Sequence, residues 1–249
     1  MNLRGIVVCV DYSDLLRKSL RRWHVGLDRL IVVTSTRDVK THQLCESLNI
    51  ETHRTDVFYA NGASFNKGAA MSEAIFAKGL RDNADWLMTF DADIVPPEDW
   101  RAQLLKNPIN CGKIYGAYRH MAPEDTEDFS ISGRPRMPQG WVIGFFMLFH
   151  SKDPCLPPAD HPLFDIHWPH AGNYDTIFCR RWPKQNQIIL TAPRMIHLGE
   201  ERRNWTGRFN TQELAAVLAK RRVHEDWGRE KMKNPPALYA NGRQVWPKI

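Results

Sequence analysis

Two aspartates spaced one residue apart are the sharpest chemical feature of the sequence. Asp91-Ala92-Asp93 directly follows WLMTF at 86–90, an apolar run typical of a buried strand. In open α/β sheets, ligands bind outside the carboxyl ends of the strands. Two carboxylates at such an end suit a hard divalent cation, Mg²⁺ or Mn²⁺. A DxD triplet also occurs by chance on protein surfaces, but charge at the end of a buried strand is costly unless it is used. We therefore predict a metal site there.

A second feature is the segment Phe65-Asn66-Lys67-Gly68, which precedes the two aspartates in the chain. Asn66 can cap a helix, and Lys67 together with the first amides of that helix can attract a phosphate. The alternative is an ordinary capped helix with a solvated lysine. GASFNKG is not a P-loop, because its lysine precedes the second glycine and no Ser or Thr follows, and the chain has no GxGxxG motif.

Two further side chains could complete the chemistry. His197 follows the strand-like run IILTAP and is a candidate third metal ligand, although a lone histidine is more often structural. Asp175 precedes the helix-like run TIFCRRW and is a candidate general base, with helix capping as the alternative.

The surrounding pattern indicates which elements position these side chains. Short apolar runs alternate with amphipathic helical patterns over the first hundred residues, which predicts an α/β fold with a mostly parallel central sheet flanked by helices. The expected strands are 5–10, 30–34, 51–58 and 86–90, and the expected helices are 13–23, 41–48 and 66–80. Later strands are expected at 113–118 and 141–149, on either side of a long acidic loop.

Length and composition restrict the class of protein. The chain has 249 residues, of which 43% are apolar and 25% charged, so it can bury a substantial core and is not disordered as a whole. Its longest apolar stretch, 141–149, is far shorter than the ~20 residues that span a bilayer, and its N-terminal apolar run is too short for a signal peptide. Five scattered cysteines without a CxxC pair favour reduced thiols. We expect a soluble cytoplasmic protein.

The excess positive charge is confined to the last third of the chain. Residues 1–175 contain 19 Lys and Arg against 22 Asp and Glu, whereas residues 176–249 contain 15 against 6. Such asymmetry indicates a polyanionic partner, a phosphate-bearing ligand or a solvated basic helix, here expected from Asn210 onward.

In this order, these features resemble the GT-A glycosyltransferases, particularly the family-2-like group. Four segments carry the resemblance: VVCVDYSDLLRKSL, VVTSTRDVKT, FNKGAAMSEAI and WLMTFDADIVPP. The resemblance covers nearly the whole chain, and the pairing of FNKG with DADI is its most specific part. It implies a Rossmann-like GT-A fold in a single domain, 1–249. Residues 1–106 would bind the nucleotide-sugar, and residues 107–249 would form the acceptor side, with a basic C-terminal helix and tail.

The resemblance also implies roles for individual residues. Those that bind the donor would be Asp11, Thr34, Asp38, Asn66, Lys67 and Asp91. Those that bind a divalent Mn²⁺ or Mg²⁺ ion would be Asp91, Asp93 and His197.

On the acceptor side, the resemblance makes Asp175 the catalytic carboxylate. The family usually has a Glu-Asp pair at this point, whereas Tyr174 precedes the aspartate here. Trp141 and Gly144 fall in a stretch that often borders the acceptor.

These observations predict a metal-dependent glycosyltransferase that moves a sugar from a nucleoside-diphosphate sugar to a hydroxyl acceptor, with inversion. The basic last third makes hydroxymethylated DNA a possible acceptor. Two alternatives remain open: a nucleotidyltransferase on a similar fold, and a non-catalytic nucleic-acid-binding protein.

Overall fold

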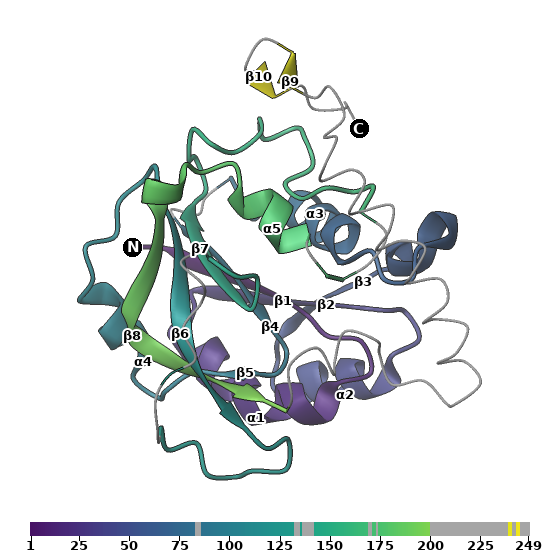
Figure 1. The fold of residues 1–249 in the computed structure, drawn as a ribbon. Helices are drawn as coiled ribbons and strands as arrows, with labels where there is room; N and C mark the ends of the chain where they lie inside the picture. The colour runs from purple at the N-terminus through teal and green to yellow at the C-terminus, as the bar shows by residue number, and fades with distance from the viewer. Residues whose placement is uncertain are drawn as a thin grey trace.

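An eight-stranded sheet forms the centre of the molecule (Figure 1). The computed structural model describes residues 1–82, 86–131, 135, 142–168, 171–172, 174–199, 239–240 and 243–244. The strand order in this sheet is β3-β2-β1-β4-β7-β6-β8-β5. The strands are β1 (Leu3–Val8), β2 (Arg29–Thr34), β3 (Glu51–Arg54), β4 (Trp86–Asp91), β5 (Ile94–Val95), β6 (Ile114–Ala122), β7 (Phe146–His150) and β8 (Gln187–Leu198), and a separate antiparallel pair is formed by β9 (Tyr239–Ala240) and β10 (Arg243–Gln244).

The sheet is mostly parallel, as the sequence predicts. β1 pairs in parallel with β2 and β4, β2 with β3, and β6 with β8. Three pairs are antiparallel: β4 with β7, β7 with β6, and β8 with β5. The valine-rich runs of β1 and β2 are buried along nearly their whole length, which explains why they read as continuous apolar segments.

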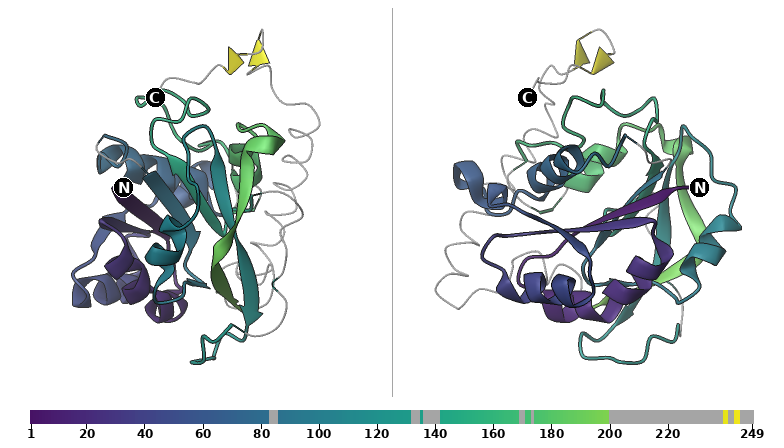
Figure 2. Two further views of the ribbon diagram at one scale, coloured as in Figure 1. Left: turned by 90° about the vertical axis from the view of Figure 1, so that its left-hand side faces the viewer. Right: turned by 180° about the vertical axis from the view of Figure 1, so that it is seen from behind.

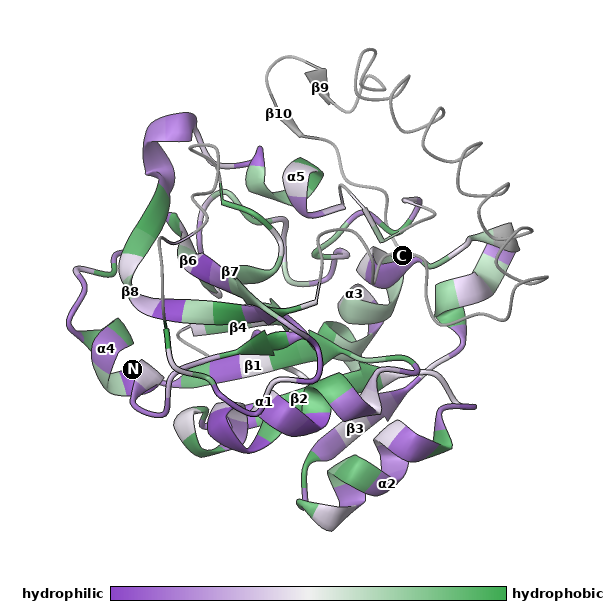
Figure 3. Ribbon diagram, turned by 60° about the horizontal axis from the view of Figure 1, so that its bottom comes forward, coloured by the Kyte–Doolittle hydropathy of each residue, from purple (hydrophilic) through white to green (hydrophobic). Residues whose placement is uncertain are grey.

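Helices cover both faces of the sheet (Figures 1 and 2). Those on one face pack on the core that contains Trp23 and Leu44, and those on the other pack on the core that contains Met71 and Phe178. Figure 3 shows hydrophobic residues concentrated along β1 and β2, whereas the edge strand β3 is largely hydrophilic. The helices are α1 (Ser13–Gly26), α2 (Val39–Ser47), α3 (Lys67–Ala77), α4 (Trp100–Leu105) and α5 (Tyr174–Cys179), with short 3-10 helices η1 (Val57–Gly62) and η2 (Lys184–Asn186).

Two expected strands are shorter than predicted. The strand expected at 51–58 ends at Arg54 because the Asp56 carboxylate accepts hydrogen bonds from Ser35 and Thr36, and the chain then enters η1. The strand expected at 141–149 begins at Phe146, whose N–H donates to the Ile143 carbonyl in a turn.

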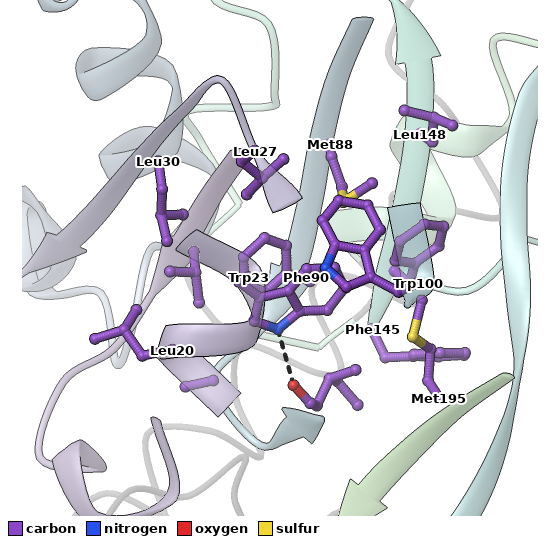
Figure 4. Packing of buried hydrophobic residues seen from close by; sticks show 14 of the residues in the cluster. Leu20, Trp23, Leu27, Leu30, Met88, Phe90, Trp100, Phe145, Leu148 and Met195 are labelled. Carbon is purple, nitrogen blue, oxygen red and sulfur yellow. Dashed lines mark hydrogen bonds between the residues drawn. The ribbon is translucent and has the colours of Figure 1, made fainter. Parts of the chain in front are cut away.

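A tryptophan on α1 fixes the turn that carries the two aspartates. The Trp23 ring stacks on Phe90 at a centroid distance of 4.0 Å and meets Trp100 edge-on at 5.0 Å. Its indole Nε1 donates to the Ile94 carbonyl at 3.0 Å, the bond dashed in Figure 4. Phe90 and Ile94 flank Asp91-Ala92-Asp93, so this core contact holds both ends of the turn.

No helix of the described residues is long and apolar enough to cross a membrane.

Candidate active site

The ends of β1 and β2 meet at one buried carboxylate. Asp38 caps α2 by accepting from the Thr41 N–H at 3.0 Å, and its Oδ2 accepts from the Asp11 N–H at 2.7 Å and from Thr34 Oγ1 at 3.3 Å. Asp11 has a positive φ of 63°, which turns the chain sharply after β1. The structure thus brings together the three predicted donor residues Asp11, Thr34 and Asp38, and the Asp38 carboxylate supports the loop that carries them.

Asn66 acts as a helix cap, as predicted. Its Oδ1 accepts from the Ala69 N–H at 2.8 Å, and its Nδ2 donates to the Ile166 carbonyl at 2.6 Å. Gly68 allows the same close approach, since a Cβ there would lie 2.6 Å from the Asp165 carbonyl oxygen. Asn66 therefore joins the start of α3 to the 164–166 segment, and its role toward a nucleotide stays a prediction.

Lys67 and Asp91 form an ion pair at the end of β4. The Lys67 ammonium donates a short hydrogen bond to Asp91 Oδ1 and also lies 5.0 Å from the centroid of the Tyr174 ring. Burial acts to lower the pKa of Lys67, but the Asp91 charge and the Tyr174 side chain outweigh it and raise that pKa above its ordinary value. Lys67 is therefore a fixed positive charge beside the predicted metal site.

Asp93 and His197 meet although they are far apart in the chain. β5 pairs with β8 so that Ile94 lies opposite His197, and the Leu198 N–H donates to the Asp93 carbonyl at 2.9 Å. His197 Nε2 is then 3.7 Å from Asp93 Oδ2, which is longer than a hydrogen bond. Both side chains are buried: His197 is 8% exposed and Asp93 is 7% exposed. β5 itself was not predicted, because its two residues form a strand only by pairing with β8.

This pair fits a divalent cation. Two atoms that ligate one ion at about 2.1 Å lie at most about 4.2 Å apart, so 3.7 Å allows one ion to bind both. His197 Nδ1 is buried and has no hydrogen-bond partner among the described residues. One or two protein ligands, completed by substrate phosphates and water, are typical of Mg²⁺ sites.

The third predicted ligand, Asp91, is directed to Lys67 instead. Within the described part of the chain, no group of three or more His, Cys, Asp and Glu side chains is arranged to hold a metal. The set of Asp91, Asp93 and His197 therefore stays a prediction, of which the structure brings two members together.

Asp175 lies at the start of α5 against the turn before β7. Its Oδ2 accepts from the Gly144 N–H at 2.7 Å. Burial raises the pKa of the Asp175 carboxyl, and although hydrogen bonds from the backbone of Gly144 and Thr176 act in the opposite direction, the net pKa is raised. A carboxylate with a raised pKa is a stronger base than an exposed aspartate, which suits deprotonation of a hydroxyl.

Gly144 has no room for a side chain. A Cβ at this position would lie 2.3 Å from Asp175 Cβ and 2.5 Å from its Oδ2. Gly144→Ala should therefore displace Asp175 and destabilise the fold by about 1–3 kcal/mol, the usual cost of overpacking. We expect a lower Tm and a lower kcat together.

The matched control for this substitution is Gly112→Ala. Gly112 has a φ of +88° but nothing within 4 Å of its would-be Cβ, so alanine there strains the backbone without touching Asp175. Thermal unfolding and turnover are measured for both variants. If Gly144→Ala kept as much turnover as Gly112→Ala at equal loss of Tm, the contact with Asp175 would have no catalytic importance.

Two predicted features lie outside the described residues. They are Trp141, predicted to border the acceptor, and the basic helix from Asn210.

A cavity of about 210 Å³ opens at the other end of α3, between Phe76 and Pro162. None of the candidate residues lines it.

The sequence patterns predict a buried position for Trp23 on the apolar side of the first helix, but they assign no role at the site to Trp23 or Tyr174. Trp23 fixes the turn of the two aspartates, and Tyr174 lies against Lys67. The adjacency of Tyr174 to Asp175 was the available signal for it, but the contact depends on how α5 packs near α3.

Comparison with known proteins supports the fold. No family model and no curated protein matches the sequence. The chain is similar in structure to mannosyl-3-phosphoglycerate synthase from Rubrobacter xylanophilus, with a TM-score of 0.50 over 94% of this chain and 75% of that chain, at 12% identity.

Two other solved structures show weaker likeness. 4-diphosphocytidyl-2C-methyl-D-erythritol synthase matches with a TM-score of 0.46 over 88% of this chain and 97% of that chain, at 14% identity. Glucosyl-3-phosphoglycerate synthase from Mycobacterium tuberculosis, in complex with Mn²⁺, UDP and phosphoglyceric acid, matches with a TM-score of 0.36 at 13% identity. That match covers 47% of this chain and 43% of that chain. Together with the strand order, the similarity to the Rubrobacter enzyme shows that the chain has the Rossmann-like GT-A fold predicted from its sequence.

Proposed function

We propose that the chain is a metal-dependent glycosyltransferase that moves a sugar from a nucleoside-diphosphate sugar to a hydroxyl acceptor. The fold that it shares with mannosyl-3-phosphoglycerate synthase supports this class of reaction. The single observation that carries the proposal is the buried pair of Asp93 and His197 at 3.7 Å, located at the carboxyl end of β4.

Each charged group has a role in this reaction. Asp93 and His197 would hold Mn²⁺ or Mg²⁺, which supplies positive charge to the leaving diphosphate when bound. Lys67 adds a second, protein-borne positive charge beside it, so negative charge that develops on the diphosphate is stabilised as the sugar departs. The loop of Asp11 and Asp38 would bind the base and the ribose.

Asp175 would act on the acceptor. The Gly144 N–H fixes one of its oxygens, and the carboxylate would remove the proton of the attacking hydroxyl. A base that activates the acceptor for direct attack leads to inversion at the sugar carbon, and the anomeric configuration of the product tests this step.

The acceptor can be a polyanion such as hydroxymethylated DNA. Residues 176–249 contain 15 Lys and Arg against 6 Asp and Glu, and this positive charge would attract a polyanion. A DNA acceptor requires its affinity to fall steeply with rising salt, because phosphate contacts release counterions. An acceptor affinity that does not change with salt would exclude it.

Product analysis separates the proposal from its two rivals. The protein is incubated with nucleoside-diphosphate sugars, or with nucleoside triphosphates, in the presence of Mn²⁺. Release of a nucleoside diphosphate supports glycosyl transfer. Release of pyrophosphate from a triphosphate would instead identify a nucleotidyltransferase. A nucleic-acid-binding protein is indicated if Asp93→Ala and His197→Ala leave every measurable activity intact.

A further inference from the structure

Tyr174 is a buried aromatic residue placed between the donor side and the acceptor side of the site. It is 3% exposed and immediately precedes Asp175 on α5. Its ring centroid lies 5.0 Å from Lys67 Nζ, within the range of a cation–π contact, and 5.7 Å from the ring of Phe164. Two consecutive residues of α5 therefore serve both sides of the site: Tyr174 contacts Lys67, and Asp175 is the proposed base.

The Lys67 ammonium has three N–H donors. Asp91 accepts one of them, and the Tyr174 ring, over which the ammonium lies, attracts the positive charge. A second carboxylate in place of the ring would bind the ammonium strongly and compete with a phosphate. An uncharged ring orients the ammonium and leaves donors for the diphosphate.

The Lys67 ammonium lies over the ring, and an interaction with the nearby hydroxyl also acts to raise the pKa of the lysine. The Tyr174 hydroxyl is buried and has no hydrogen-bond partner among the described residues. Burial raises the pKa of this phenol well above its ordinary value, so it stays neutral beside Lys67. Phenylalanine should therefore replace tyrosine here with little loss.

We propose that Tyr174 is a positioning residue for the donor, whose ring holds the Lys67 ammonium where it meets the leaving diphosphate. This inference rests on the proposed function of the site. Its distinguishing consequence is that removal of the ring weakens nucleotide binding, whereas removal of the hydroxyl alone does not.

Three variants test the inference by calorimetry with nucleoside diphosphate and Mn²⁺. Tyr174→Leu removes the ring and should weaken binding about tenfold, which lies between the usual sizes of exposed and desolvated cation–π contacts. Tyr174→Phe should restore the Kd to within about threefold of the wild type. Phe178→Leu is the control, because Phe178 lies on the same helix as Tyr174 and packs on Phe149 and Phe164 outside that helix. It should lower the Tm but leave the Kd within about twofold.

Two outcomes would overturn the inference. One is that Tyr174→Leu changes the Kd no more than Phe178→Leu does. The other is that Tyr174→Phe binds as weakly as Tyr174→Leu, which would assign the role to the hydroxyl.

Nuclear magnetic resonance of ¹³C-labelled lysine separates this inference from the proposed function. The ring should shift the Lys67 ε-methylene protons upfield in the wild type and in Tyr174→Phe, but not in Tyr174→Leu. Lys67→Met assigns the signal. An unshifted wild-type signal contradicts the inference alone. A shifted signal in a protein that binds no nucleoside diphosphate shows instead that the proposed function, and with it the donor role of Tyr174, is wrong.

Discussion

Asp175→Asn is expected to lower kcat by about 10²–10⁴-fold, the usual contribution of a general base. Asparagine keeps an oxygen for the Gly144 N–H, which Asp175 holds at 2.7 Å, but cannot accept a proton from the acceptor. Asp175 forms no hydrogen bond with Lys67 or Asp91, so we expect the substitution to change the nucleotide Kd little. Steady-state turnover and calorimetry check the two expectations separately.

The pH dependence of the same reaction gives an independent test. A general base works only when it is deprotonated, so activity falls as the pH drops through its pKa. Burial raises the pKa of Asp175, which moves the acid limb of the kcat/KM profile to a higher pH than an ordinary aspartate would give. This limb should be absent from the residual rate of Asp175→Asn.

Asp160→Asn is the matched control for this substitution, since the Asp160 side chain is 78% exposed and outside the site. It should keep both the rate and the acid limb. An acid limb that persisted in Asp175→Asn would show that another group is the base.

Asp93→Asn and His197→Ala are expected to abolish the metal-dependent part of nucleotide binding. Both side chains are buried and 3.7 Å apart. If either is lost, a bound ion keeps only the other one of these two ligands. In the wild type, nucleotide at about 100 times its Kd stabilises the fold by about 2.7 kcal/mol, which raises the Tm of a chain this size by about 5–10 °C. With either variant, addition of Mn²⁺ should add nothing to the effect of the nucleotide alone.

Asp125→Asn, an exposed aspartate after β6, controls for the loss of a negative charge. It should show the full metal-dependent shift. If Asp93→Asn showed that shift as well, the metal would have to bind elsewhere.

The parts of the fold that could be predicted are those that leave a local signal in the sequence. The strands β1, β2 and β4 are apolar along their length because both faces are covered, and Asn66 caps α3 with a local hydrogen bond. Such signals lie within a few residues of each other. They were enough to place the two aspartates at a strand end and Lys67 at a helix start.

The features that could not be predicted depend on partners far away in the chain. β5 exists because Ile94 and Val95 pair with β8, about a hundred residues later. The direction of Asp91 toward Lys67, and of Lys67 toward Tyr174, follows from the packing of α3 and α5 on one face of the sheet. A sequence pattern shows which residues could do chemistry, but the choice among their possible partners is made by tertiary packing.

We propose that Asp93, His197 and a divalent cation together bind a nucleoside diphosphate. Thermal unfolding tests this binding: the Tm of the wild type and of Asp93→Asn is measured in a screen of nucleoside diphosphates and their sugars, each with and without Mn²⁺. We expect one nucleotide to raise the Tm of the wild type only when Mn²⁺ is present, and we expect Asp93→Asn to lose this rise. A wild-type Tm that no nucleotide raises in a metal-dependent way would contradict it.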